Sequence, residues 1–265
     1  MDTNPSIRSI AGYAELPLDT LDAEKIEAVW CYTPLVEGRQ LVLPDGRMDL
    51  VVHCAVTPQG IAKPVLLVIA GPTQTPTVVA LRPQTVILGV RFHIGWGGAC
   101  LGIAPSAVRN RTVVGSEVER CLGLLAREIL VQNTLLGVES ALRSVAGALA
   151  SRARAAPAHG RVLHVLDCMQ RDTEGEGVVT SWGLPSARTL RRDMMAVVGL
   201  PLRTLAGILR FQRAMALLVT GTASIGEVAI AAGYADQSHM TREFRRFGGF
   251  TPAVPTPAPL VRLAP

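Results

Sequence analysis

The chain has 265 residues, enough for one large domain or for two of ordinary size. Hydrophobic residues make up 49% of the chain and charged residues 18%, which excludes a chain that is disordered throughout. The net charge is +5, and residues 151–265 hold 14 arginines against 8 acidic side chains. This excess of arginine in the second part favours an anionic partner, and nucleic acid is the first candidate.

The cysteines and the apolar segments exclude several other classes of protein. The five cysteines are widely spaced and never form a CxxC pair, which favours free thiols over a disulfide framework or a cysteine-rich zinc site. The first residues lack the basic segment and apolar core of a secretory signal, and the uncharged apolar runs are too short to span a membrane. We therefore expect a cytoplasmic protein without a membrane segment.

The first hundred residues have the pattern of β structure. Apolar runs alternate with glycine and proline turns such as Pro44-Asp45-Gly46, and the runs lie at 41–43, 48–56, 65–70, 77–81 and 85–92. Short strands between such turns predict an antiparallel barrel or sandwich. From 117 to about 150 the apolar period becomes helical and predicts one or two amphipathic helices, followed by a hinge at 151–160.

A helix-turn-helix pattern covers residues 224–247. Ser224 and Glu227 have the spacing of a capping box, Gly233 stands where a helix would end with a positive φ, and Asp236 suits the N-cap of a second helix. The apolar residues of the second helix share one face. A polar face remains, which is able to read base edges or hold phosphates and consists of Gln237, Ser238, Thr241, Arg242 and Arg245. The alternative is the solvated face of an ordinary helix.

A second unit of this kind lies upstream. Residues 178–183 predict a short helix, 184–185 a turn, and Ser186 the N-cap of a further helix. On that helix Arg188, Arg191 and Arg192 share one face, which is the electrostatic pattern of a phosphate-binding surface, although such a stripe can also be merely solvated. Residues 201–219 are apolar on many sides and predict a buried helix that joins the two units.

These segments resemble the DNA-binding domain of the AraC/XylS family. The matching stretches are SARTLRR at 186–192, VGLP at 198–201, LRFQRA at 209–214, IGEVAIAAGYADQSHMTREFRRF at 225–247 and GFTP at 249–252. The resemblance implies two helix-turn-helix subdomains joined by a linker helix, with recognition helices in adjacent major grooves about 34 Å apart. Two features depart from the family: the turn at 183–186 is one residue longer than usual, and a proline-rich stretch at 253–259 replaces the usual tail.

The front half resembles an uncharacterised sensor-type domain that precedes some AraC-type domains. The stretches LPDGRMDLV at 43–51, GVRFHIG at 89–95 and LGI at 101–103 carry this weaker resemblance. Similar N-terminal domains are small β-barrels related to cupins, used for effector binding or dimerisation. No motif defines ligand residues, and His53 and His93 fit core or pocket-wall positions better than metal sites. We predict no catalytic residue, no metal and no cofactor.

The predicted fold is therefore α+β. We expect a small cupin-like β-barrel with helices at 1–155 for effector binding or dimerisation, an all-α double helix-turn-helix domain at 156–252, and a disordered tail at 253–265. The predicted function is a sequence-specific transcription regulator with promoter DNA, a small-molecule effector and a second copy of the chain as partners, and RNA polymerase if it is an activator. Two alternatives stay open: a front half that only dimerises, and a cupin-like enzyme with a helical appendage. The helices at 117–150 are expected between the barrel and the DNA-binding half.

Overall fold

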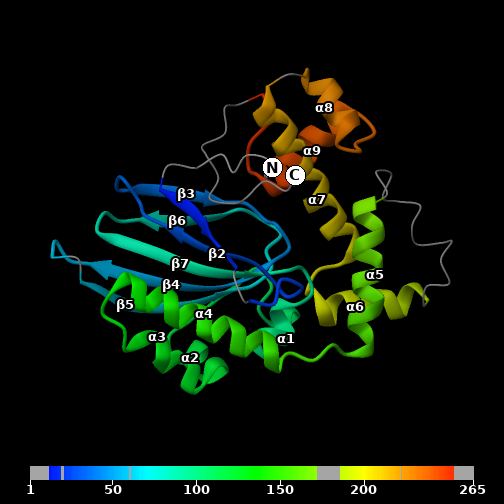
Figure 1. The fold of residues 1–265 in the computed structure, drawn as a ribbon. Coiled ribbons are helices and arrows are strands. Elements are labelled where there is room, and N and C mark those ends of the chain that lie inside the picture. The colour runs from blue at the N-terminus through cyan, green and yellow to red at the C-terminus, as the bar shows by residue number, and fades with distance from the viewer. Residues whose placement is uncertain (1–11, 19–20, 60, 172–185, 222, 254–265) are drawn as a thin grey trace, which may run out of the picture.

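The computed structural model describes residues 12–18, 21–59, 61–171, 186–221 and 223–253 (Figure 1). Antiparallel pairing joins most of the strands into a six-stranded sheet of order β1-β2-β7-β4-β5-β8, while β3 and β6 pair separately. The strands are β1 (Tyr13–Leu16), β2 (Ile26–Tyr32), β3 (Gly38–Val42), β4 (Met48–Val56), β5 (Ala62–Ala70), β6 (Thr77–Leu81), β7 (Thr85–Phe92) and β8 (Thr112–Val114).

The helices cluster after the strands in the chain. Those of the front half are α1 (Gly97–Leu101), the 3-10 helix η1 (Pro105–Ala107), α2 (Ser116–Leu122), α3 (Leu124–Leu130) and α4 (Leu135–Arg152). Those of the second half are α5 (Pro157–Arg171), α6 (Ala187–Val197), α7 (Leu202–Thr220), α8 (Ile225–Ala231) and α9 (Gln237–Phe247). The α+β prediction is confirmed, with an open sheet in place of a closed barrel.

Alternation along the central strands separates two faces of the large sheet. In β4, Leu50, Val52 and Cys54 are fully buried against the helices, whereas Asp49, Val51 and His53 point to the opposite face, because successive side chains of a strand alternate. The opposite face carries a smaller apolar cluster to which β6 contributes Leu81. One sheet therefore separates a large helix-covered core from a second face that is rich in polar and aromatic groups.

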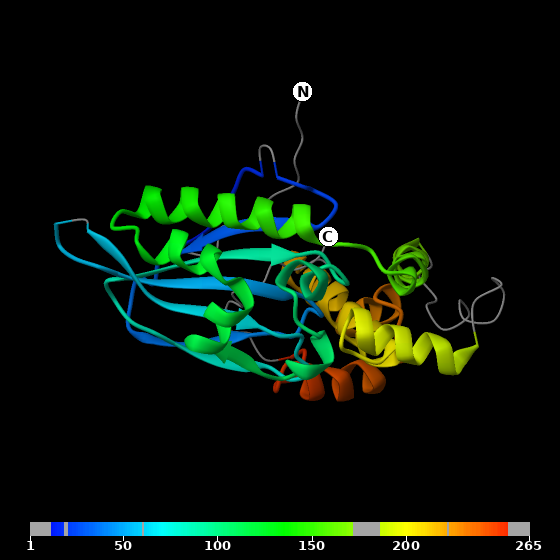
Figure 2. The same ribbon diagram turned by 90° about the horizontal axis from the view of Figure 1, so that it is seen from below.

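The helices α2–α4 cover one face of the sheet and do not lie between the two halves, contrary to the sequence-based expectation. Along α4, Val138, Leu142, Val145 and Leu149 are fully buried in the core that they share with the sheet. Figure 2 shows α4 running along the sheet, away from α7–α9. The physical reason is the apolar stripe of α4, which is buried most effectively on the flat apolar face of the strands.

The two halves meet instead at the turn between β3 and β4. Leu43 is 1% exposed and belongs to the core of the helical half. The carbonyl oxygen of Pro44 accepts a hydrogen bond of 2.7 Å from Nε2 of Gln212 on α7. At Gly46, φ is +77°, and a Cβ there would collide with the side chain of Leu205. This turn is therefore built to touch the linker helix α7.

Several sequence predictions can be compared with these elements. The strands at 48–56, 77–81 and 85–92 are confirmed with their bounds, while β1, β2 and β8 were missed. The predicted helix at 178–183, the turn at 184–185 and the tail from 254 onward lie outside the described residues. Within the described residues, no single helix has the length and hydropathy of a membrane span, and the bent pair of α6 and α7 meets both criteria only jointly.

Candidate nucleic-acid interface

The helix pair α8 and α9 begins with the caps that the sequence predicts. The hydroxyl of Ser224 accepts a hydrogen bond from the amide of Glu227, and the Glu227 carboxylate accepts one from the amide of Ser224. The carboxylate of Asp236 accepts a 2.6 Å bond from the amide of His239 at the start of α9. Gly233 has a φ of +86°, so the predicted helix end is also confirmed.

The apolar face of α9 is fixed by aromatic packing. Met240, Phe244 and Phe247 are fully buried, and the ring of Phe244 lies edge-on to Phe211 of α7 with centroids 4.9 Å apart. This packing fixes the rotation of α9 about its axis. The opposite face is consequently directed away from the core.

That outward face carries the five residues that the sequence singles out. Gln237, Ser238, Arg242 and Arg245 are exposed, and Thr241 is half-buried. The Thr241 hydroxyl donates a 2.9 Å hydrogen bond to the carbonyl oxygen of Gln237 one turn earlier. Thr241 can therefore accept a hydrogen bond from a partner or offer its methyl group, while its proton is used within the helix.

The upstream helix α6 carries the three candidate arginines on its exposed face. The hydroxyl of Ser186 caps the helix by accepting a 3.3 Å bond from the amide of Thr189. Arg188, Arg191 and Arg192 are all exposed, and Arg192 has a side chain that is 74% exposed. Arginine side chains of this kind can pair with phosphates or with guanine edges.

A buried ion pair ties α6 to α5, and the sequence reasoning missed it. Asp193 is 2% exposed, and its Oδ2 accepts a 2.7 Å hydrogen bond from Nε of Arg161 and lies 2.6 Å from Nη2 of the same guanidinium. This charge-assisted contact holds α6 against α5. The available signal was an acidic residue on the otherwise apolar side of α6.

A second polar group ties α9 to α7. Arg210 of α7 and Glu243 of α9 approach to 3.8 Å, and the guanidinium lies 5.8 Å from the ring centre of Tyr234. Burial and the neighbouring Glu243 carboxylate raise the pKa of Tyr234, which keeps the phenol neutral. The group thus connects α7, the turn before α9 and α9 itself.

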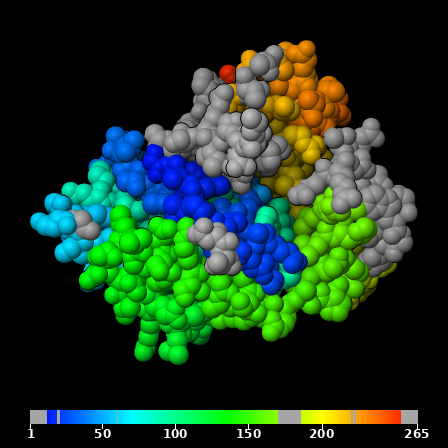
Figure 3. Space-filling view, viewed as in Figure 1, coloured from blue at the N-terminus to red at the C-terminus, as the bar shows by residue number. Residues whose placement is uncertain are grey.

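The helix α7 separates the two exposed faces. Its 19 residues correspond to a length of about 28 Å at 1.5 Å per residue. Figure 1 shows α6 near one end of α7 and the α8–α9 pair near the other, and Figure 3 shows the α8 region standing out from the body of the molecule. The helix α9 contacts the middle of α7, where Arg210 lies near Glu243 and Phe211 packs on Phe244.

The front half contains a buried group of charges beside the turn that touches α7. Arg91 is 4% exposed, and its Nε lies 3.4 Å from Asp49 and 3.9 Å from Asp45. Asp49 also accepts a 3.1 Å hydrogen bond from the Trp30 indole. Burial, with the neighbouring carboxylates, raises the pKa of Asp49 to about 6 despite the opposing charge of Arg91.

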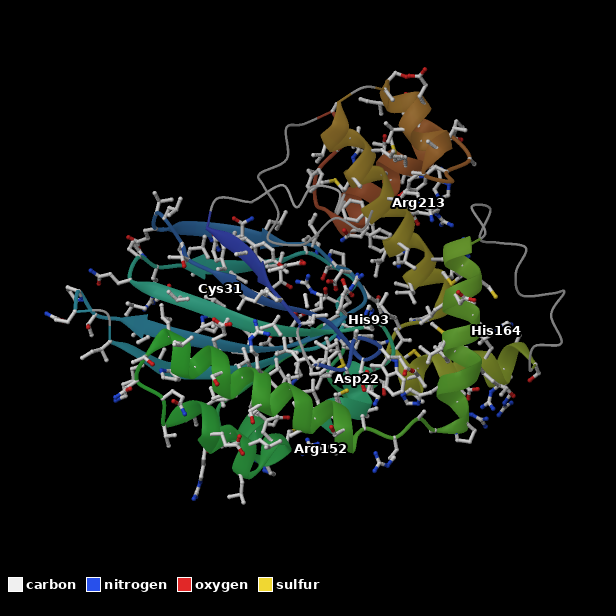
Figure 4. The ribbon with its side chains drawn as sticks, in the orientation of Figure 1. Asp22, Cys31, His93, Arg152, His164 and Arg213 are labelled. Carbon is white, nitrogen blue, oxygen red and sulfur yellow. The ribbon has the colours of Figure 1, made fainter. Side chains whose placement is uncertain are left out.

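A cavity of about 230 Å³ lies at the junction of the two halves. Its front wall includes Glu27, Arg47 and His93, and its back wall includes Leu163 of α5 and Leu209 of α7. The Nε of Arg47 donates to the Glu27 carboxylate, and His93 Nδ1 lies 3.7 Å from the same carboxylate. Figure 4 shows His93 at the end of the sheet that faces α5, the helix that carries His164.

The described residues offer little for metal or covalent chemistry. No group of three His, Cys, Asp or Glu side chains among them could hold a metal ion. All five cysteines are free thiols, of which Cys54, Cys100 and Cys168 are buried and the other two half-buried. Cys168 is buried, and its sulfur lies 3.9 Å from Nε2 of His164 one helical turn earlier.

The fold and the two outward-facing helices define a helix-turn-helix protein. A family model described as a helix-turn-helix domain matches residues 185–254, and one described as a domain of unknown function (DUF6597) matches residues 17–114. The C-terminal part of the chain is an AraC-type helix-turn-helix domain, which confirms the resemblance seen in the sequence. The helix-turn-helix match covers about a quarter of the chain.

Comparison with solved structures finds ToxT from Vibrio cholerae. One ToxT crystal structure is 10% identical in sequence, covers 92% of this chain and 96% of ToxT, and has a TM-score of 0.42. A structure of wild-type ToxT with bound unsaturated fatty acid is also 10% identical, covers 83% of this chain and 95% of ToxT, and has a TM-score of 0.39. Comparison with curated protein sequences finds no match.

Proposed function

We propose that the chain is a sequence-specific transcription regulator that contacts promoter DNA with α6 and α9. The observation that carries this proposal is the pair of capped, 11-residue helices, which flank α7 in the chain and have their polar faces exposed. The contacting residues are Arg188, Arg191, Arg192, Gln237, Ser238, Thr241, Arg242 and Arg245. Arginine pairs bidentately with guanine and glutamine with adenine, so both helices carry side chains that can select bases.

The test measures binding of the full chain to the promoter region of its own gene by fluorescence anisotropy at several salt concentrations. We expect affinity to fall steeply with salt, because phosphate contacts release counterions. The double variant Arg191→Ala/Arg242→Ala should weaken binding about a hundredfold, if each contact contributes about 1–2 kcal/mol. The matched control Arg120→Ala/Arg127→Ala removes two exposed arginines from α2 and α3 and should leave the affinity unchanged. Equal losses in the two double variants would contradict the proposed interface.

We further propose that an effector bound by the front half adjusts this DNA binding, and that the front half has no catalytic role. The direct contact between the turn at 43–47 and α7 supports a regulatory connection, since a shift of that turn reaches the helix between the two recognition helices. A regulator of this kind works where the chromosome is, in the cytoplasm. As an activator it would also contact RNA polymerase. Transcription from the promoter with purified polymerase, with and without the protein, separates activation from repression.

A homodimer is the second part of the proposal. The side chains of Leu124, Val131 and Leu136 on α3 and α4 are between 74% and 76% exposed, which is unusual for large apolar residues near one another in sequence. Sedimentation of the full chain at micromolar concentration should give the mass of two copies. Leu124→Glu/Leu136→Glu should lower the measured mass to that of one copy. Urea unfolding of this variant in the absence of DNA should stay cooperative. A monomeric wild-type chain would contradict the dimer.

A further inference from the structure

We propose that Arg213 of α7 binds a phosphate of the DNA backbone at the edge of the groove that α9 enters. Arg213 lies outside α6 and α9, so this contact brings the helix between them into the interface. The inference deepens the proposed function and rests on it, because the anion that Arg213 binds is supplied by the DNA.

Arg213 is the exception among the arginines that are buried or half-buried. Within the described residues, each of the others lies within ion-pair distance of a carboxylate, and these pairs are Arg47 with Glu27, Arg91 with Asp49, Arg143 with Glu139, Arg161 with Asp193 and Arg210 with Glu243. Arg213 is half-buried too, but its guanidinium has no hydrogen bond, ion pair or ring contact in the described part of the chain. An arginine offers five N–H donors and a permanent charge, and partial burial without a partner leaves both unmatched.

The side of α7 that carries Arg213 is directed outward. The residues at 203, 206, 210, 213 and 217 are spaced by three and four, so they share one side of the helix. All of them are exposed or half-buried, whereas Leu205, Ile208 and Phe211 on other sides of α7 are fully buried. Figure 4 shows Arg213 beside the α8–α9 pair and away from the sheet. Its guanidinium is therefore accessible from solvent.

The neighbouring Arg210 connects this side of α7 to the beginning of α9. The guanidinium of Arg210 lies 5.8 Å from the ring centre of Tyr234, which stands two residues before the Asp236 N-cap of α9. Helix residues that are three apart have Cβ atoms about 5–6 Å from each other, so Arg213 is a direct neighbour of Arg210. Arg213 consequently lies close to the end of α9 at which Gln237 is exposed.

The packing of α7 behind α9 favours a phosphate over a base as the partner of Arg213. Phe211 of α7 packs edge-on against Phe244 on the buried face of α9, so α7 is set back from the exposed face of α9. The major groove has room for one helix, and a side chain from the helix behind reaches the rim of the groove, where the phosphates lie. A phosphate contact fixes the position of the protein on the duplex and carries no direct sequence information. Arg213 thus helps to hold α9 in the groove and leaves the choice of bases to α9.

The test measures DNA binding of the full chain by fluorescence anisotropy, on the promoter fragment and on its single-base variants, at several salt concentrations. Arg213→Gln keeps most of the side-chain stem and removes the charge. It should weaken binding to all fragments alike, about threefold to tenfold, and should lower the slope of log affinity against log salt by about one. Arg213→Lys should recover most of the affinity and the slope, because a lysine also neutralises one phosphate.

The matched control is Arg127→Gln, which removes the same charge from an exposed arginine of α3 in the front half. Its affinity and salt slope should equal those of the wild type. Urea denaturation of the three variants in the absence of DNA should give the midpoint of the wild type. This comparison separates a lost DNA contact from a weakened fold.

Several results would overturn the contact. Binding by Arg213→Gln that equals binding by Arg127→Gln would show that Arg213 is only solvated. A loss of affinity at unchanged salt slope, a loss confined to one base pair, or a loss that Arg213→Lys does not reduce would each contradict a phosphate contact.

The double variant Arg191→Ala/Arg242→Ala, measured on the same fragments, separates this inference from the proposed function. If the double variant binds weakly while Arg213→Gln binds as the wild type, only the Arg213 contact is overturned and the proposed interface stands. A wild-type chain without salt-dependent binding to the promoter fragment contradicts both.

Discussion

The helices α6 and α9 are similar in sequence pattern but are held by different surroundings. Each has 11 residues, a side-chain N-cap and exposed arginines. The helix α9 packs on α7 and α8, within the C-terminal half. In contrast, α6 is paired to α5 and lies against η1 of the front half, where a Cβ at Gly199 would be 2.7 Å from the carbonyl carbon of Pro105.

This difference assigns different tasks to the two helices. A displacement within the front half reaches α6 through η1 and α5, whereas it reaches α9 through α7. The exposed face of α6 offers only arginines, while α9 adds the amide and hydroxyls of Gln237 and Ser238. We therefore expect α9 to contribute more of the base selectivity and α6 more of the effector-dependent affinity.

The largest loss of stability should come from removing the aromatic packing that holds α9. Phe244→Ala removes a fully buried ring that contacts Phe211 and Phe250, so the unfolding free energy should fall by about 3–5 kcal/mol. Urea denaturation of the full chain measures it. The control Leu35→Ala removes a side chain that is 68% exposed and should cost little. A loss below about 1 kcal/mol for Phe244→Ala would mean that α9 is not held by this packing.

The second prediction releases α6 from α5. Arg161→Ala leaves the carboxylate of Asp193 buried without the guanidinium that pairs with it, which should destabilise the chain by about 2–3 kcal/mol. Arg192, at 3.7 Å from the other Asp193 oxygen, can recover part of this loss. Adding Asp193→Asn should restore stability relative to the single variant, since the stranded charge is removed. Additive losses in the urea midpoint would argue against a direct pair.

Local features of both units were predictable because short stretches of sequence encode them. The caps at Ser186, Ser224 and Asp236 were confirmed, as was the buried face of α9, since each depends on residues within one or two turns. The strands at 48–56, 77–81 and 85–92 follow from runs rich in apolar residues between turn residues. In contrast, β8 has three residues and provides too short a pattern to detect.

Contacts between distant residues could not be predicted in this way. Pro44 and Gln212 are 168 residues apart, and nothing near either residue marks the hydrogen bond between them. The position of α2–α4 was wrong for the same reason, because an amphipathic pattern shows that a face is buried but not which surface covers it. Three points stay predictions: the base contacts of the arginines, the domain boundary between residues 155 and 156, and the effector site.

The third prediction tests the division of labour directly. Arg242→Ala should relax selectivity at one base pair of the site, with a loss of about 1–3 kcal/mol of discrimination there. Arg191→Ala should weaken all sequences more evenly and lower the salt dependence by about one unit of slope. Binding to a set of single-base operator variants at several salt concentrations measures both. If Arg191→Ala changes selectivity and Arg242→Ala changes only the salt slope, the roles of the two helices are reversed.

The smallest expected change in the free energy of unfolding distinguishes the N-caps of α6 and α8. Ser224 has a reciprocal capping box with Glu227, whereas Ser186 accepts one amide hydrogen bond and has no such partner. Ser224→Ala removes the hydroxyl that accepts from the Glu227 amide and should cost about 1 kcal/mol, and Ser186→Ala should cost somewhat less. Glycine at either position should recover all but a few tenths of a kcal/mol, because a backbone without a side chain lets water reach the amides. Urea midpoints of the four single variants measure this order. A larger loss for Ser186→Ala than for Ser224→Ala would show that the start of α6, rather than that of α8, is the more tightly held of the two.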